Sequence, residues 1–268
     1  MSLSNHNFSL KFTTLNKISF NEDNYWININ KPKNFSSAKV VAIVKRITKA
    51  KKVGHAGTLD PFATGVLAVA VNKSTKQAEL LMKERKGYKA TICFGEFKDS
   101  DDITGKTESI SNNRISKEEF SNVLANFIGK IEQTPSKFSA IKIAGERAYK
   151  LARLNQEVEM PKRIVSIYKI KLTKYEIDEC EIEIECSKGT YVRSLVRAIC
   201  QDAKIAGYTK DLERTKIGKL KIESTISLDE LKNIVNFNGS VKEGSFLALN
   251  VEDNCKRDDL DGFNSVES

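Results

Sequence analysis

The chain has 268 residues and a formal net charge of +9 at pH 7. This length allows one large domain, or one domain with a small appendage, whose core needs neither disulfides nor metal. The five cysteines contain no CxxC pair and there are only two histidines, so we expect no disulfide framework and no zinc site, and a cytoplasmic location. No run approaches the roughly 18 apolar residues of a membrane span, and the N-terminus lacks the apolar core of a signal peptide.

The charge is unevenly distributed along the chain. Residues 252–268 hold six acids and two bases, whereas residues 39–52 hold six bases and no acid. A basic body with a short acidic tail favours a polyanionic partner, most commonly nucleic acid, although such charge also serves solubility alone. We expect residues 1–24, which are polar and rich in asparagine, to form a mobile extension and residues 252–268 to form a disordered tail.

Apolar periodicity predicts an alternation of strands and helices without a strict βαβ repeat. Ser36 or Ser37 is expected to cap the first helix, Thr190 a later one, and the pairs Ser116/Glu119 and Ser227/Glu230 form capping boxes. This order indicates an α+β fold with a mixed, mainly antiparallel sheet flanked by helices. The expected strands are residues 25–30, 66–71, 88–97, 164–175, 180–186 and 217–226, and the expected helices begin near residues 37, 75, 116, 146, 190 and 227.

Residues 54–65, GHAGTLDPFATG, break all periodicity and contain three glycines and one proline. Such a composition is typical of an ordered loop with special backbone angles. Asp60 lies within it, and a carboxylate on a rigid loop can act as nucleophile, general base or metal ligand. The commoner role of a loop aspartate is an Asx-turn or a cap.

Three further side chains are candidates for a functional site. Arg193 falls in the first turn of a predicted helix, an unfavourable placement of about 0.3–1 kcal/mol for a cation, so we expect an anionic partner. Tyr88 opens a strand beside a charged turn, where an aromatic ring can stack on a nucleobase. His55 shares the loop of Asp60 and could contact RNA. A surface arginine, a half-buried core tyrosine and a loop histidine bonded to backbone are the ordinary alternatives.

Five segments together resemble the TruB-type tRNA pseudouridine synthases in order and spacing. They are KPKNFSS (31–37), GHAGTLDPFATGVLAV (54–69), KGYKATICFG (86–95), PSKFSAIK (135–142) and SKGTYVRSL (187–195). The resemblance covers about residues 25–235 and implies a catalytic domain over residues 25–251. It implies that uridine 55 in the T-loop of tRNA is converted to pseudouridine without cofactor or metal.

The resemblance also implies roles for single residues. Asp60 is similar to the essential catalytic carboxylate, Arg193 to the arginine that pairs with it, and Tyr88 to the tyrosine that stacks on the base and assists proton removal. We therefore expect an ion pair between Asp60 and Arg193 at the floor of a cleft, with the bases of residues 39–52 placed near the RNA phosphates. The residues implied to bind substrate or to support its loop are His55, Tyr191, Leu212 and Lys31, the last together with Pro32.

The chain departs from the family pattern in small and large ways. Asn34 stands where glycine is common, and Ala68 where proline is frequent. Too few residues follow the last matching segment for a PUA-type RNA-binding domain, so either this branch lacks that domain or the chain was shortened. The short C-terminus favours a stand-alone enzyme that needs no guide RNA. We also expect a monomer that binds the tRNA T-arm and does not contact membranes. A non-catalytic RNA-binding protein, a guide-directed enzyme and, least favoured, a hydrolase using Asp60 stay open as alternatives.

Overall fold

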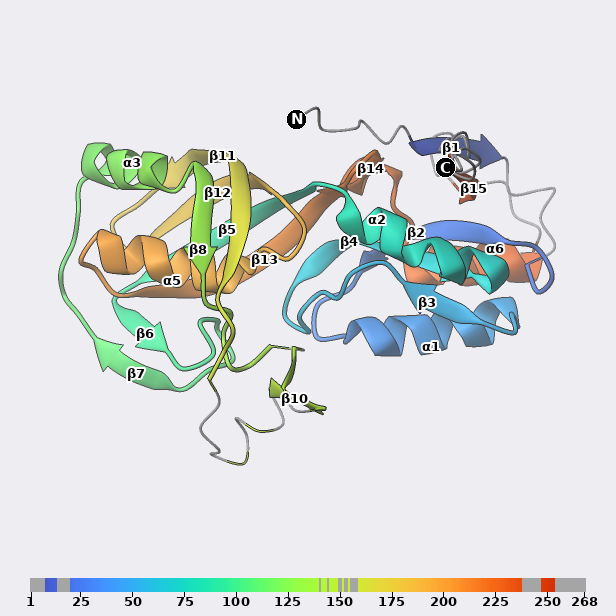
Figure 1. Ribbon diagram of the computed structural model, residues 1–268, viewed down its shortest axis with the longest axis horizontal. Helices are drawn as coiled ribbons and strands as arrows, with labels where there is room; N and C mark the ends of the chain where they lie inside the picture. Colours follow the sequence, from blue (N-terminus) through green and yellow to red (C-terminus); the bar gives the residue numbers. More distant parts are fainter. Residues whose placement is uncertain are drawn as a thin grey trace, which may run out of the picture.

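The computed structural model describes residues 8–13, 20–139, 141–143, 145–148, 151, 154, 159–237 and 247–253. One long mixed sheet runs through this part of the chain in the order β1-β15-β2-β4-β13-β5-β12-β11-β8 (Figure 1). Every pairing along this order is antiparallel except that of β4 with β13, so the expected α+β class is confirmed. The strands are β1 (Phe8–Thr13), β2 (Tyr25–Lys31), β4 (Thr64–Val71), β5 (Lys86–Phe94), β8 (Gly129–Gln133), β11 (Arg163–Tyr175), β12 (Glu179–Cys186), β13 (Gly207–Ile217) and β15 (Leu247–Asp253).

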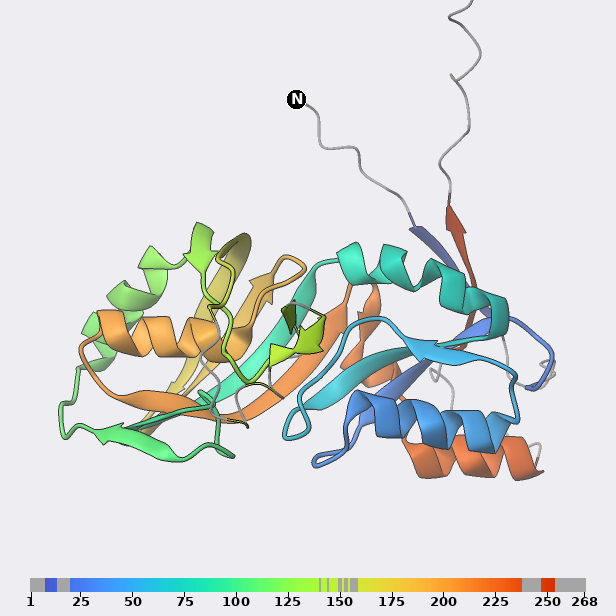
Figure 2. The ribbon, with the colours of Figure 1, turned by 60° about the horizontal axis from the view of Figure 1, so that its bottom comes forward.

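Helices cover the two halves of this sheet separately. In Figure 1, α3 (Lys117–Asn126) and α5 (Val192–Asp202) cover the half built from β5, β8, β11 and β12. Figure 2 shows α1 (Ser37–Thr48) and α6 (Leu228–Phe237) side by side on the other half. They pack on the face of β2 and β4 that carries Ile27 and Leu67, while α2 (Ala78–Lys83) packs with Trp26 and Val66, which point the other way because strand side chains alternate.

The two halves meet at a fork along one edge of β4. Thr64 and Gly65 at its start pair with β13, whereas Val69 to Val71 pair with the short strand β3 (Val53–His55). The chain between β3 and β4, the glycine-rich loop, leaves the sheet at this fork. Gly65 is required here, because its φ is +97° and a Cβ atom would lie 2.3 Å from the carbonyl oxygen of Arg214.

The structure differs from the sequence predictions in three local features. The sequence patterns do not predict the central strand β13, because its segment GYTKDLERTKI is rich in charged residues. These residues become favourable in a sheet only beside oppositely charged side chains of neighbouring strands, as in the pair Lys210–Glu179. Thr190 does not cap α5: the N-cap is Tyr191, and the Thr190 hydroxyl donates to the carbonyl of Ser187 at 3.0 Å. The segment 217–226, expected as one strand, is divided: Ile217 ends β13, β14 covers only Leu220–Lys221, and the 3-10 turn η3 (Ile222–Ser224) follows.

Other segments were predicted only in part. Residues 8–13, expected within a mobile extension, form β1 and pair with β15, which itself reaches Asp253. The rest of the expected acidic tail and most of the helix expected near 146–154 lie outside the described residues; within the latter, β10 (Glu146–Arg147) pairs with β9 (Lys142–Ile143). Both capping boxes are confirmed by their hydrogen bonds. The helices that the structure describes include none with the length and apolar character of a membrane span.

Candidate active site

Asp60 lies on the loop at the fork of β4, and hydrogen bonds from other segments fix the backbone of the residues next to it. The Ser37 hydroxyl accepts from the amide of Leu59 at 2.9 Å and donates to the carbonyl of the same residue at 3.1 Å. The carbonyl of Pro61 accepts from the amide of Asn34 at 2.8 Å. Asn34 has φ +65°, so the turn that commonly uses glycine is kept. The residues on both sides of Asp60 are therefore held in place.

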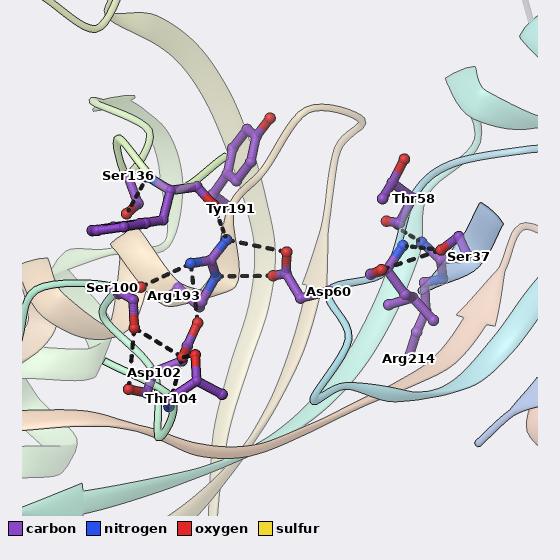
Figure 3. A network of polar contacts seen from close by, with 12 residues as sticks. Ser37, Thr58, Asp60, Ser100, Asp102, Thr104, Ser136, Tyr191, Arg193 and Arg214 are labelled. Atoms are coloured by element: carbon purple, nitrogen blue, oxygen red, sulfur yellow. Dashed lines mark hydrogen bonds and ion pairs between the residues drawn. The ribbon is translucent and has the colours of Figure 1, made fainter. Parts of the chain in front are cut away.

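The carboxylate of Asp60 faces the guanidinium of Arg193 edge to edge (Figure 3). Arg193 Nε lies 2.9 Å from Oδ2, and Nη2 donates to Oδ1 at 3.1 Å. The arginine side chain is 3% exposed and the aspartate side chain 33% exposed. The contact expected from the sequence is thus present, in the two-pronged geometry that orients a carboxylate most strictly.

A second carboxylate, which sequence reasoning missed, binds the other edge of Arg193. Nη1 donates to Asp102 Oδ2 at 3.1 Å and to the carbonyl of Ser100 at 2.8 Å. Asp102 Oδ1 in turn accepts from the Ser100 hydroxyl at 2.9 Å and from the Thr104 amide at 2.9 Å. Burial lowers the pKa of Arg193, but the surrounding carboxylates of Asp60, Asp102 and Asp101 together raise it by more, so its pKa lies above the ordinary value. Asp102 comes from the loop between β6 (Glu96–Lys98) and β7 (Thr107–Ile110).

Asp60 and Arg193 stand in the wall of a cavity of about 700 Å³. Tyr88, Tyr191 and Leu212 also line it, so the structure brings five of the seven predicted site residues together. Asp60 is the one carboxylate among the lining residues, whereas the lining cations, besides Arg193, are Lys86, Lys162, Arg163, Lys188 and Arg214. This excess of positive charge favours an anionic ligand in the cavity.

The two tyrosines of the cavity are held differently. Burial raises the pKa of Tyr88 more than the nearby guanidinium of Arg214 lowers it, so the phenol is neutral at neutral pH. The backbone of Tyr191 is fixed by the Gln133 side chain, which accepts from its amide at 2.8 Å and donates to its carbonyl at 3.0 Å. The Arg163 guanidinium lies 5.3 Å from the centre of the Tyr191 ring. The backbone of Tyr191 is therefore fixed, and its ring lies beside a guanidinium, before any ligand arrives.

Arg214, on β13, was not predicted as a site residue. It is 1% exposed and holds the loop from the side opposite Arg193 (Figure 3). Its guanidinium donates to the carbonyls of Val66 at 2.8 Å, Gly57 at 3.0 Å and Thr58 at 3.4 Å. Two buried arginines thus flank the cavity, one neutralised by carboxylates and the other bound to backbone carbonyls.

Comparison with known proteins places this site in a family. Residues 45–192 match the TruB family pseudouridylate synthase N-terminal domain, more than half of the chain. The chain belongs to the TruB family. tRNA pseudouridine synthase B of Caulobacter sp. (strain K31) is 41% identical over 210 residues, which are 78% of this chain and 68% of that protein. The Brucella ovis protein of the same name is 40% identical over 210 residues, 78% of this chain and 65% of the relative. The chain therefore spans about two thirds of the length of these TruB-family relatives, and the resemblance found in its motifs is confirmed.

Solved structures share the fold of this TruB-family chain. A crystal structure of a Cbf5-Nop10-Gar1 complex superposes with a TM-score of 0.65 at 24% identity, covering 90% of this chain and 65% of that one. The archaeal box H/ACA sRNP Nop10-Cbf5 complex gives a TM-score of 0.64 at 21% identity, covering 92% of this chain and 67% of that one. At such identities the likeness establishes the pseudouridine synthase fold and nothing finer.

Lys31 and His55, grouped with substrate binding by the resemblance, do not line the cavity of the TruB-family chain. Lys31 is completely buried, and its ammonium donates to the carbonyls of Phe35 at 2.6 Å, Pro32 at 2.9 Å and Pro61 at 3.2 Å. Burial lowers the pKa of Lys31 to about 8, against a smaller opposing effect of Asp60. Lys31 therefore supports the loop from beneath and does not reach a ligand in the cavity. His55 ends β3, and burial lowers its pKa, which keeps its ring neutral.

No group of three or more histidine, cysteine or carboxylate side chains in the described part of the chain is arranged to hold a metal ion. Among the predicted site residues, sequence reasoning found the carboxylate, its arginine and the aromatic walls. It missed Asp102 and Arg214. The only sequence signal for Asp102 was the run DSDD within a turn-rich loop, and Arg214 belonged to a strand that was itself missed.

Proposed function

We propose that this TruB-family chain converts uridine 55 in the T-loop of tRNA to pseudouridine. The observation that carries the proposal is the ion pair of Asp60 and Arg193 in the wall of a basic cavity that is large enough for a nucleotide. Relatives about 40% identical are named tRNA pseudouridine synthase B, which supports tRNA as the substrate. The proposal includes action as a cytoplasmic monomer without cofactor, metal or guide RNA.

The reaction is an isomerisation in which nothing is consumed. The bond from ribose C1′ to N1 of uracil breaks, the base turns within the cavity, and a bond from C1′ to C5 forms. C5 loses a proton and N1 gains one, so atoms and charge balance. Asp60 can add to the sugar or the base, or stabilise the departing base. Arg193 fixes the orientation of this carboxylate and balances its charge, since both oxygens contact the guanidinium.

Tyr88 offers a ring on which the extruded base stacks and a hydroxyl near the base edge. Because burial raises its pKa, the hydroxyl is a neutral phenol, so it accepts the C5 proton only as it passes its own proton on, directly or through water, to N1 of the base. Tyr191 and Leu212 complete the walls around the base. Extrusion of a base from a folded loop costs a few kcal/mol, which contacts of the basic wall with flanking phosphates offset.

The proposal is tested with an unmodified tRNA transcript and a matched transcript that carries cytidine at position 55. After incubation with the protein, pseudouridine is derivatised so that it gains mass and is mapped by mass spectrometry. We expect modification at position 55 of the first transcript and none in the second. The Asp60→Asn variant should bind tRNA and form no pseudouridine. Modification only at other positions, or turnover by the variant, would refute the proposal.

A further inference from the structure

Two groups of surface lysines differ in their surroundings. The first group lies on the face of the large sheet opposite α3 and α5, where lysines and acids from neighbouring strands pair across β5, β11, β12 and β13. The pairs are Lys89–Glu181 at 2.9 Å, Lys210–Glu179 at 2.6 Å, Lys216–Glu185 at 3.0 Å and Lys174–Glu179 at 4.0 Å. This face, the paired face, is thus close to neutral.

The second group, the basic edge, surrounds β3 and consists of Lys49, Lys51, Lys52, Lys73 and Lys76. All five are exposed, and none forms an ion pair within the described residues. They come from three elements: the end of α1, the link to β3, and the 3-10 helix η2 (Asn72–Gln77).

Backbone contacts bring these three elements together. The amide of Asn72 donates to the carbonyl of Lys52 at 2.7 Å, and the amide of Lys52 donates to Asn72 Oδ1 at 3.3 Å. Lys52 and Lys73 are therefore neighbours in space although 21 positions separate them. The acids close to these elements are Asp23, whose carbonyl accepts from the Asn72 side chain at 2.9 Å, its neighbour Glu22, and Glu79, which pairs with Lys83 at 3.6 Å. Five cations against three acids, one of which already has a lysine partner, leave the basic edge positive.

Interspersed opposite charges, such as those of the paired face, are in general enough for solubility. A cluster of like charges without partners instead costs repulsion, and it is the electrostatic footprint of a protein that binds phosphates. None of the large apolar side chains that the structure shows exposed lies on the basic edge, which disfavours insertion into a membrane surface. Nucleic acid is therefore the partner that this surface fits.

The basic edge is joined directly to the active-site loop. The strand β3 covers three residues, or about 10 Å at the usual rise, from Lys52 to the start of the loop that carries Asp60. In Figure 2, β3 leads from the end of α1 towards the centre of the molecule. A nucleic acid with one nucleotide in the cavity therefore reaches the basic edge within a few nucleotides of backbone.

We propose that the basic edge binds the sugar-phosphate backbone of the substrate RNA outside the loop that enters the cavity. The body of the RNA then crosses the end of the molecule formed by α1, β3 and η2, and it avoids the paired face of the large sheet. The inference rests on the proposed function for the identity of the RNA, and it adds where that RNA lies.

The test compares two variants that lose the same charge. The edge variant carries Lys52→Ala, Lys73→Ala and Lys76→Ala, and the control variant carries Lys174→Ala, Lys210→Ala and Lys216→Ala on the paired face. The affinity of each for tRNA is measured at several salt concentrations, and thermal unfolding confirms that each is folded. We expect the edge variant to bind at least tenfold more weakly at low salt. Its slope of log affinity against log salt should be shallower by about 2, at roughly 0.7–0.9 per lost phosphate contact.

The control variant should keep its affinity within about twofold, and both variants should keep the wild-type rate at saturating RNA. Unchanged affinity of the edge variant, or an equal loss in both variants, overturns the inference. Weaker binding of the edge variant to anionic phosphatidylserine vesicles with unchanged affinity for tRNA would assign the surface to a membrane and would also overturn it. If the wild type binds tRNA but forms no pseudouridine, the proposed function fails while the binding comparison still decides the inference.

Discussion

The carboxylates of Asp60 and Asp102 bind two different edges of one guanidinium, that of Arg193. Asp60 takes the edge formed by Nε and Nη2, and Asp102 takes Nη1 (Figure 3). The arginine is buried, and a buried cation that loses a partner is strongly destabilising, by about 3–5 kcal/mol. The geometry of the candidate catalytic carboxylate therefore depends on an acid from a separate loop.

Asp102→Asn should slow isomerisation about 10-fold to 100-fold, because one negative partner of Arg193 is lost and the arginine shifts relative to Asp60. The affinity for tRNA should change by less than about twofold, since Asp102 does not line the cavity. Single-turnover rates and equilibrium binding measure the two effects. The matched control is Asp99→Asn in the same loop, whose carboxylate accepts from the amide of Lys106 at 2.8 Å. Equal rates for the two variants would contradict the dependence on Asp102.

Tyr88→Phe keeps the ring that lines the cavity and removes the hydroxyl. We expect tRNA affinity to be retained and the rate at saturating RNA to fall about 10²-fold or more, the usual range for a lost proton-transfer group. The same change at the other lining tyrosine, Tyr191→Phe, should affect the rate less, because Tyr191 is assigned only to the wall. A wild-type rate for Tyr88→Phe would remove the hydroxyl from the mechanism.

Lys31→Met reports on the buried ammonium beneath the loop. The pKa of Lys31 is about 8 in the folded chain and about 10.5 in the unfolded chain. Between these values the unfolded chain binds the proton that the folded chain has released, so this group makes the free energy of unfolding rise with pH. Denaturant unfolding near pH 7 and near pH 9.5 should show the wild type gaining about 2 kcal/mol relative to Lys31→Met. The exposed-site control Lys171→Met should show no such gain, and a pH-independent difference for Lys31→Met would mean that its ammonium is not titrating in this range.

Gly65→Ala tests the close approach of β4 to β13. An added Cβ would lie 2.3 Å from the Arg214 carbonyl oxygen and would also be strained by a φ of +97°, so we expect destabilisation of more than about 2 kcal/mol. Gly129→Ala is the control, because its φ is +114° but no atom lies within 4 Å of the added Cβ. It should cost about 1 kcal/mol. Similar melting temperatures for the two variants would show that the junction adapts easily.

Local patterns predicted the elements whose stability is decided within a few residues. The capping boxes at Ser116 and Ser227 and the alternation along β5 are of this kind, since hydrogen bonds and side-chain directions repeat at fixed short spacings. The strand β13 escaped because its charged residues are paired by acids of other strands, such as Glu179 and Glu185, which no local pattern reveals.

By itself, the sequence determined the family, the loop that carries Asp60 and the partner expected for Arg193, because motif order and an unfavourably placed cation are readable along the chain. Only the tertiary structure decided that Asp102 shares this arginine and that Arg214 holds the loop. The residues in these contacts are 91 and up to 157 positions apart. Their distances follow from the path of the sheet and the fork in β4, and a side chain cannot be assigned to a buried partner until that path places the two together.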